Sequence, residues 1–221
     1  MNTLAPDECR ALGTLIEKAL TTPAQYPLSL NSLVTGINQR SNRDPVVEFD
    51  EDRTLRAVDG LRAKGFLRDV SFTGARVEKY RHVLGEALEL RPPELSILCE
   101  LLVRGPQTVG ELRARASRMH PFESIEVVEA VLAALAGREA PLVRELPPLP
   151  GSRAKRWMQL FCEDLHPIGS VAAWPATESP VAVLAPIAPD RIAALESTVE
   201  ALEARVRELE ETVAQLKVVL A

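Results

Sequence analysis

Apolar residues in the first third of the chain recur every three or four positions, the spacing of one helix face. A first helix is expected at residues 6–20, because a proline and two acids stand where it begins. A second helix begins after Ser29 or Asn31, either of which can cap it. A third spans residues 50–65 and ends at a glycine. The pattern therefore predicts three successive helices.

The hydrophobic period changes after these helices. Residues 66–70 and 77–83 alternate between apolar and polar positions on either side of Gly74, which is typical of a β-hairpin. Three helices followed by a hairpin is the order of elements in a winged-helix domain.

The same signals occur twice. A pattern of Gly-x-Arg-x-x-basic-aromatic spans residues 74–80 and returns at residues 151–157, and residues 108–111 form a capping box before another helix. We therefore expect a mainly α fold with small β-hairpins (α+β). It contains two tandem winged-helix domains, at residues 1–86 and 87–165.

The remaining chain divides into a linker and a tail. Residues 166–189 are rich in Pro and Ala and read as an extended linker. In residues 190–221, Ile or Val alternates with Leu at steps of three and four, which favours a parallel two-stranded coiled coil and a homodimer. The alternative is an amphipathic helix that folds back on its own domains. The seam residues are Ile192, Leu195, Val199, Leu202, Val206, Leu209, Val213 and Leu216.

Charge and cysteine usage narrow the class of protein. The net charge is −5, and no block has the basic excess of a strong non-specific nucleic-acid binder. Cys9, Cys99 and Cys162 are far apart and are interpreted as small hydrophobic residues in a reducing cytosol. Without a leader pattern or a long apolar stretch, we expect a cytoplasmic protein with no membrane contact.

Several polar motifs resemble those of the bacterial YceH-like family, a family of tandem winged-helix proteins of unestablished function. The resemblance covers about residues 3–165, supports the expected architecture and implies no active-site residues. The motifs are Glu17-Lys18, Thr21-Thr22-Pro23, Tyr26-Pro27-Leu28, the run from Asn38 to Pro45, the run from Leu101 to Thr108, and His120-Pro121-Phe122.

Winged helices bind DNA with the third helix in the major groove and the wing along the backbone. Arginine suits such contacts because it can bind phosphate or guanine in a bidentate manner. Arg53 and Arg56 lie on the third helix, and Arg113, Arg115 and Arg118 lie in the second copy. The main candidates for DNA or partner contact are Arg40, Asn42, Arg43, Arg76, Lys79, Arg81, Arg153, Lys155 and Arg156.

Other features argue against recognition of DNA bases by the third helices. Acids occupy residues 50–52 at the start of the third helix, and Glu123, Glu126 and Glu129 stand at the equivalent helix of the second copy. The polar loop 38–45 is either a contact site for DNA or a partner protein, or a self-satisfying turn in which Asp44 holds Arg43 or bonds its own backbone.

Tyr80 and Trp157, at matching wing positions, are expected to pack each hairpin onto its helices rather than to stack on bases. No catalytic motif or Cys/His cluster is visible, so we expect neither an enzyme nor a bound metal or cofactor. Basic residues at both wings favour a dimeric DNA-binding or transcription-related regulator. The alternative is a protein-protein interaction scaffold, as in the bacterial condensin subunit ScpB, which this chain resembles in architecture only.

Overall fold

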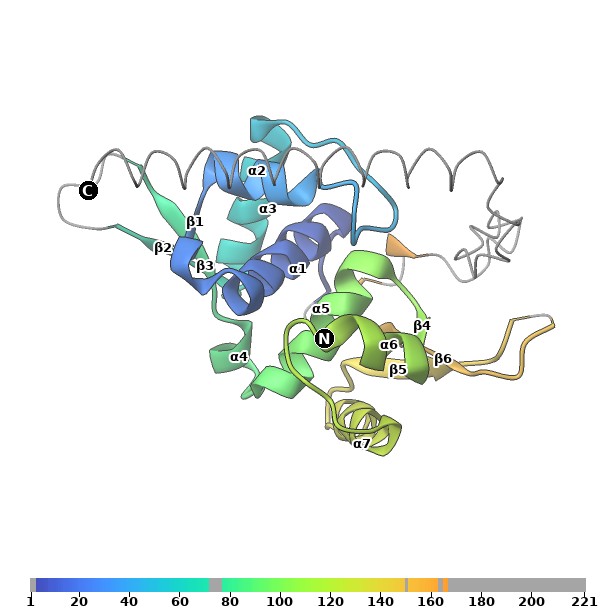
Figure 1. Ribbon diagram of the computed structural model, residues 1–221. Coiled ribbons are helices and arrows are strands. Elements are labelled where there is room, and N and C mark those ends of the chain that lie inside the picture. The colour runs from blue at the N-terminus through green and yellow to red at the C-terminus, as the bar shows by residue number, and fades with distance from the viewer. Residues whose placement is uncertain (1–2, 72–76, 150, 163–164, 167–221) are drawn as a thin grey trace, which may run out of the picture. The chain divides into compact units, whose positions relative to one another are not determined.

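The elements of the fold are seen in a computed structural model that describes residues 3–71, 77–149, 151–162 and 165–166 (Figure 1). Three predicted features lie outside the described residues: the linker after His166, the coiled coil with its eight seam residues, and Arg76. The described residues belong to one compact unit of helices and two small antiparallel sheets, which confirms the α+β class. No helix in the described ranges is long and apolar enough to cross a membrane.

The first copy runs helix, strand, two helices and two strands, with one short 3₁₀ turn. Its elements are α1 (Pro6–Thr21), η1 (Pro23–Gln25), β1 (Leu28–Ser29), α2 (Leu30–Ile37), α3 (Glu51–Ala63), β2 (Leu67–Val70) and β3 (Lys79–His82). Ser29 caps α2, since its hydroxyl accepts a hydrogen bond from the Ser32 amide at 3.3 Å. Asp50 caps α3 by accepting one from the Arg53 amide at 2.7 Å. The three predicted helices and the hairpin strands are confirmed, with Ser29 rather than Asn31 as the cap.

The second copy repeats this order after a short connecting helix. Its elements are α4 (Leu84–Ala87), α5 (Pro92–Arg104), β4 (Gln107–Thr108), α6 (Val109–Ala116), α7 (Ile125–Ala136), β5 (Val143–Leu146) and β6 (Arg156–Gln159). The capping box at the start of α6 is present: the Thr108 hydroxyl accepts from the Glu111 amide, and the Glu111 carboxylate accepts from the Thr108 amide. The internal repeat of the sequence is therefore a repeat of the structure.

The two sheets match in strand order and in register. The orders are β1-β3-β2 and β4-β6-β5, with all neighbours antiparallel. Tyr80 lies opposite Leu28, and Trp157 lies opposite Gln107 at the same place in the other sheet. Tyr80 is buried and Trp157 packs half-buried against the core, so both are core aromatics as predicted. The sequence pattern missed β1 and β4, the two-residue strands that complete each sheet.

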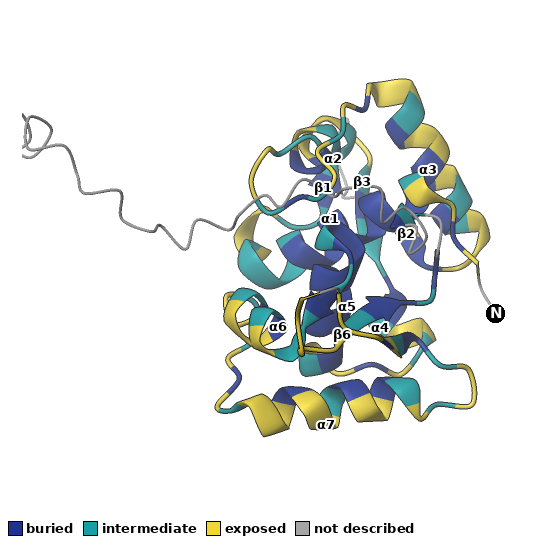
Figure 2. Ribbon diagram, turned by 90° about the vertical axis from the view of Figure 1, so that its right-hand side faces the viewer, coloured by how far each residue is buried: buried dark blue, intermediate teal, exposed yellow. Residues whose placement is uncertain are grey.

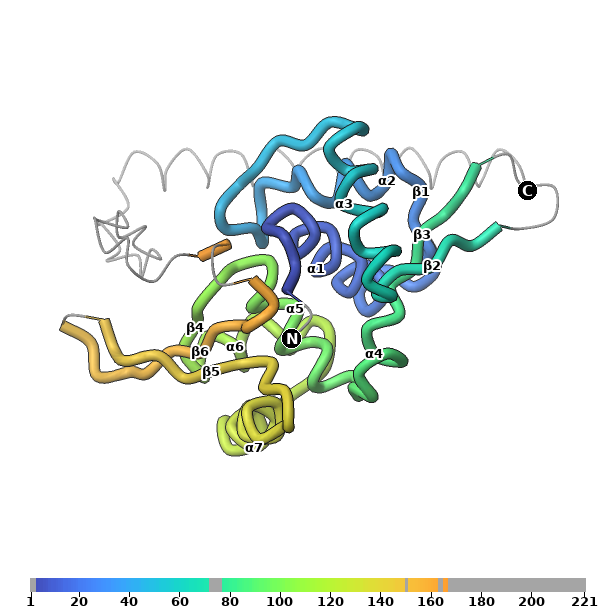
Figure 3. The backbone as a smooth tube through the Cα atoms, turned by 180° about the vertical axis from the view of Figure 1, so that it is seen from behind, coloured from blue at the N-terminus to red at the C-terminus, as the bar shows by residue number. Residues whose placement is uncertain are grey.

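The two copies pack against each other along α1 and α5, which lie side by side in Figures 1 and 3. Gly13 sits at this contact. A Cβ built there would lie 2.7 Å from Val103 Cγ1 and 3.0 Å from Leu102 Cβ, so the backbones approach closely because Gly13 has no side chain. The Cys99 thiol also lies at this contact, 3.2 Å from the Gly13 carbonyl oxygen. The core is thus continuous between the copies.

Candidate functional site

Two wing bases are tied to nearby acids. Arg81 donates a hydrogen bond to Glu86 at 2.8 Å, and the Lys155 ammonium lies 2.7 Å from a Glu145 carboxylate oxygen. Both pairs are at the surface, where an ion pair contributes about 0.2–1 kcal/mol. A phosphate could therefore compete for either base at little cost. Lys79 also has an interaction within the structure.

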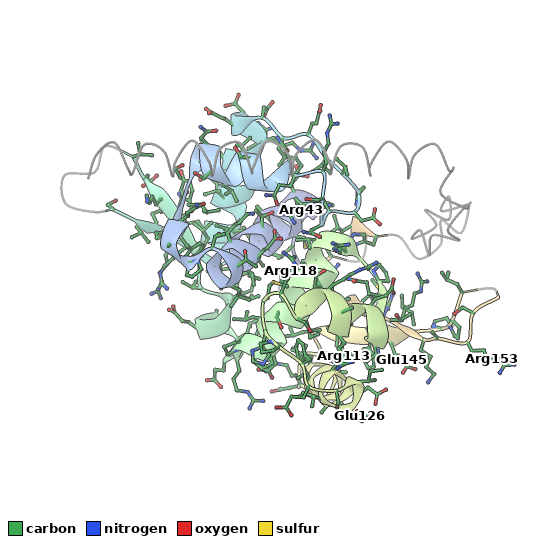
Figure 4. All side chains as sticks on the ribbon, viewed as in Figure 1. Arg43, Arg113, Arg118, Glu126, Glu145 and Arg153 are labelled. Atoms are coloured by element: carbon green, nitrogen blue, oxygen red, sulfur yellow. The ribbon has the colours of Figure 1, made fainter. Side chains whose placement is uncertain are left out.

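Three arginines keep free guanidinium groups. Arg40, Arg56 and Arg153 are exposed and have no hydrogen-bond or ion-pair partner among the described residues. Figure 4 places Arg153 at the outer end of the β5–β6 hairpin, away from Arg43. Arg156 lies half-buried at the start of β6. The candidate contact residues therefore do not form one basic face.

Arg43 points inward instead of toward solvent. Its side chain is 0 % exposed and forms an ion pair with the Glu17 carboxylate. It also donates to the carbonyl oxygens of Gly36 and Asn42, both at 2.8 Å, and to the Gln39 side chain at 3.2 Å. Arg43 is thus a structural residue of the 38–45 loop, and the acid that holds it is Glu17 rather than the expected Asp44.

The Arg43–Glu17 pair belongs to a ring of polar and charged side chains that joins the two copies. We call it the buried charge ring because Glu17, Arg43 and Glu100 are buried, whereas the Arg104 and Arg118 side chains are 21% and 30% exposed. Arg118, from the turn after α6, donates to Glu17 Oε1 at 2.6 Å and to Glu100 Oε1 at 2.8 Å. Glu100, on α5, is 0 % exposed and its other oxygen lies 3.3 Å from Arg104 Nε. The ring closes where Arg104 donates to the Asn42 side chain. Its members are Glu17, Asn42, Arg43, Glu100, Arg104 and Arg118.

The ring keeps the Glu17 carboxylate ionised. Burial by itself raises the pKa of Glu17, but hydrogen bonds and charge from Arg43 and Arg118 outweigh it, so the pKa lies below its ordinary value. With three arginines and two glutamates, the ring carries one net positive charge. Glu17 thus takes part in the contact between the two copies through Arg118.

A second set of polar contacts fastens the 38–45 loop to the other copy. Arg10 is 1 % exposed and donates to the carbonyl oxygens of Val103 at 3.2 Å and Pro45 at 2.7 Å. Burial, with the charge of Arg43 next, lowers the pKa of Arg10 to about 10, which still leaves it protonated near neutral pH. The Asp44 amide donates to the Val103 carbonyl at 2.8 Å. Of the two interpretations of this loop, the structural one fits these contacts.

Other predicted arginines are also internally engaged. Arg53 forms a bidentate pair with Asp7 at 2.7 Å and lies over the Phe49 ring, 3.9 Å from its centroid. Arg115 donates to Gln107 at 2.7 Å, and Arg113 donates to the Glu123 carbonyl oxygen at 2.8 Å. These contacts shape the fold around α3 and α7, and of the three arginines on α3 only Arg56 has no partner among the described residues.

The third helix of each copy begins with exposed acids, although α3 also exposes Arg56. On α3, Glu51, Asp52 and Asp59 are exposed, and Arg62 is paired with Asp59 and with Asp69. Along α7, exposed and buried residues alternate, and the helix lies at the edge of the described part of the chain (Figure 2). The residues 125–136 of α7 include no Lys or Arg.

Cysteines and histidines are placed as structural residues. Cys9, Cys99 and Cys162 are buried free thiols, as predicted. Among the described residues, no group of three or more His, Cys, Asp or Glu is placed to hold a metal ion.

His82 lies in the sheet of the first copy with its ring 6.0 Å from that of Tyr26, whose hydroxyl accepts from the His82 amide at 2.6 Å. Burial first, and then the charge of Arg81, lower the pKa of His82 to about 4, against a smaller opposing effect of Glu86. In the unfolded chain, the His82 side chain has its ordinary pKa of about 6.5. The contribution of neutral, buried His82 to the stability of the fold is therefore complete above about pH 6.5. It is lost as the pH falls toward 4.

We expect this titration to lower the free energy of unfolding by on the order of 2 kcal/mol between pH 7 and 4. Urea denaturation of the wild type and of His82→Gln at several pH values measures it. The two stability profiles should converge as pH falls, because other groups titrate alike in both proteins. Parallel profiles would contradict the role given to His82.

Two similar halves joined by a buried charge ring define a class of protein: an internally duplicated α+β unit with a fixed arrangement of its copies. The family described as "Protein of unknown function, DUF480" matches residues 4–165, and the chain belongs to this family. The expected membership of a YceH-like, uncharacterised bacterial family is thereby confirmed.

Relatives extend over most of the chain. The UPF0502 protein of Citrifermentans bemidjiense is 56% identical over 159 residues, covering 72% of this chain and 74% of the relative. That of Geobacter sulfurreducens is 49% identical over 189 residues, covering 86% and 85%. That of Shewanella pealeana is 47% identical over 164 residues, covering 72% and 76%.

Proposed function

We propose that the two copies are tandem winged-helix domains and that the protein is a non-enzymatic scaffold that binds other proteins. The matched order of elements supports the winged-helix assignment, because each copy has three helices, a hairpin and a short strand that completes the sheet. The non-enzymatic part of the proposal is supported by the ring, in which Glu17 and Glu100 are held by arginines.

The exposed acids at the starts of α3 and α7 carry the proposal. In winged-helix proteins that bind DNA, the start of the third helix lies in the major groove between two rows of phosphates. Glu51 and Asp52 are exposed at that position in α3, and Glu126 is exposed in α7. Carboxylates there repel phosphate, whereas a protein partner can offer complementary bases.

Isolation of the tagged full-length protein from its native cells, with and without nuclease, tests this function. A protein partner should be recovered in near-stoichiometric amount in both samples. Substitution of the free wing arginine, Arg153→Ala, should leave its recovery unchanged. Loss of the partner on nuclease treatment, or no partner at all, would overturn the proposal.

The second candidate function is DNA-backbone binding by the wing of the second copy. It is favoured by one observation: Arg153 is exposed without a partner in the described ranges, and Lys155 is held by an exposed acid. Under this candidate, Arg153→Ala with Lys155→Ala weakens binding of mixed-sequence duplex and reduces the salt slope by about 1–2. Fluorescence anisotropy across a salt series measures both. Undetectable binding by the wild type at low salt would remove this candidate.

A homodimer formed by residues 190–221 remains part of the proposal. It is supported by the alternation of Ile or Val with Leu in that segment. Sedimentation should give a dimer for the full-length protein and a monomer for a version that ends at Pro189. Equal masses would instead favour a tail that folds back on its own chain.

A further inference from the structure

The outward face of α7 exposes apolar side chains that the fold does not cover. Val128, Leu132 and Leu135 are fully buried against the rest of the second copy, whereas Ile125 is 43% exposed and Val127 is 41% exposed. Ala130, Ala133 and Ala134 are exposed along the same helix. Val127, Ala130 and Ala134 share one side of α7 by their spacing of three and four residues, whereas Ile125 lies on another side of the helix.

The charged residues of α7 itself are all acidic. Glu126 and Glu129 are exposed on the helix itself. The nearby Arg113 is directed to the carbonyl oxygens of Phe122, at 3.4 Å, and Glu123, at 2.8 Å. Figure 4 shows Glu126 on α7 at the edge of the unit. The face is therefore apolar with an acidic border.

The exposed apolar side chains and the acids beside them limit which molecules can bind to this face of α7. Nucleic acid would bring phosphates toward Glu126 and Glu129. The chain's own tail, residues 190–221, has four bases and seven acids and is therefore also acidic. A second copy of α7 would bring acids against acids. A binding partner with apolar side chains and flanking bases can cover the exposed apolar side chains and also pair with Glu126 and Glu129.

We propose that the outward face of α7 binds an amphipathic helix of a partner protein, with an apolar stripe between flanking Lys or Arg residues. This inference rests on the proposed protein-binding function and assigns it to one surface. Ala130 and Ala134, four residues apart, allow a close approach of the partner helix. Val127 contributes its exposed methyl groups, and Glu126 and Glu129 meet the bases. The 12-residue length of α7 corresponds to about 18 Å of contact.

A designed pair of labelled peptides of about 18 residues tests the surface directly. Both have Leu at helical spacing, and the flanking positions are Lys in one peptide and Glu in the other. By fluorescence anisotropy, the full-length protein should bind the Lys peptide at least about tenfold more tightly than the Glu peptide. Glu129→Lys and Ala130→Arg should each weaken that binding at least about tenfold, the first by charge and the second by bulk and charge.

Glu48→Lys is the matched control, because Glu48 is exposed on the first copy and the substitution makes the same change in net charge. It should leave the peptide affinity unchanged within about twofold. Both α7 positions are exposed, and unchanged urea midpoints will verify that the variants fold. Binding without preference for the Lys peptide, or equal effects of Glu48→Lys and Glu129→Lys, would overturn the site.

The isolation experiment, repeated with the α7 variants, separates this inference from the function on which it rests. A partner recovered with the wild type and lost with Glu129→Lys and Ala130→Arg supports both. A partner retained by both variants overturns the α7 site and leaves the proposed function intact. No partner with the wild type overturns the proposed function itself.

Discussion

Replacement of Glu17 by glutamine is expected to lower the free energy of unfolding by about 3–5 kcal/mol. Glu17 is the acid that holds Arg43, whose side chain is 0 % exposed, and it also binds Arg118. Glutamine keeps the size of the side chain but removes the charge. A buried guanidinium would then lack its compensating anion, which costs far more than a lost surface pair. Urea denaturation at pH 7 measures the change.

Glu86→Gln is the control, because Glu86 pairs with Arg81 and Arg68 at the surface and its side chain is 55% exposed. This substitution should cost no more than about 1 kcal/mol. Similar losses for both variants would show that the ring contributes no more than surface pairs. The double variant Glu17→Gln with Arg43→Met should recover part of the loss, because no unpaired charge is then left at that position.

A leucine at position 13 is expected to destabilise the protein by about 3 kcal/mol or more. Even a Cβ at Gly13 would lie 2.7 Å from Val103 Cγ1, and leucine adds three further carbons between α1 and α5. The helices would have to separate, which would also disturb the ring that crosses the same contact. Thermal and urea unfolding measure the loss.

Gly110→Leu provides the matched control in α6, because a Cβ at Gly110 meets no atom within 4 Å. There the substitution should be neutral or stabilise by up to about 1 kcal/mol through helix propensity. Destabilisation of equal size at both positions would contradict the close approach at Gly13.

Local signals predicted the elements of the fold well. The Asp50 cap of α3 depends on neighbours in sequence, and so does the alternation that marks β2 and β3. By contrast, β1 and β4 have two residues each and no period to detect. They are strands because β3 and β6 pair with them, which is a tertiary effect.

The environment of the candidate residues was much harder to predict. Arg43 and Glu17 are 26 residues apart, and Arg118 and Glu17 are 101 apart, so neither pairing follows from spacing. One signal was present: Glu100 interrupts an otherwise apolar run on α5, and a lone acid there needs a partner. Local sequence identifies such an acid but does not identify which arginine reaches it.

The buried charge ring also limits how the chain can be divided. Glu17, Asn42 and Arg43 come from the first copy, and Glu100, Arg104 and Arg118 come from the second. A fragment that ends between the copies would lose the two contacts of the ring that cross between them, Arg118 with Glu17 and Arg104 with Asn42. We therefore expect residues 3–166 to unfold in a single cooperative transition.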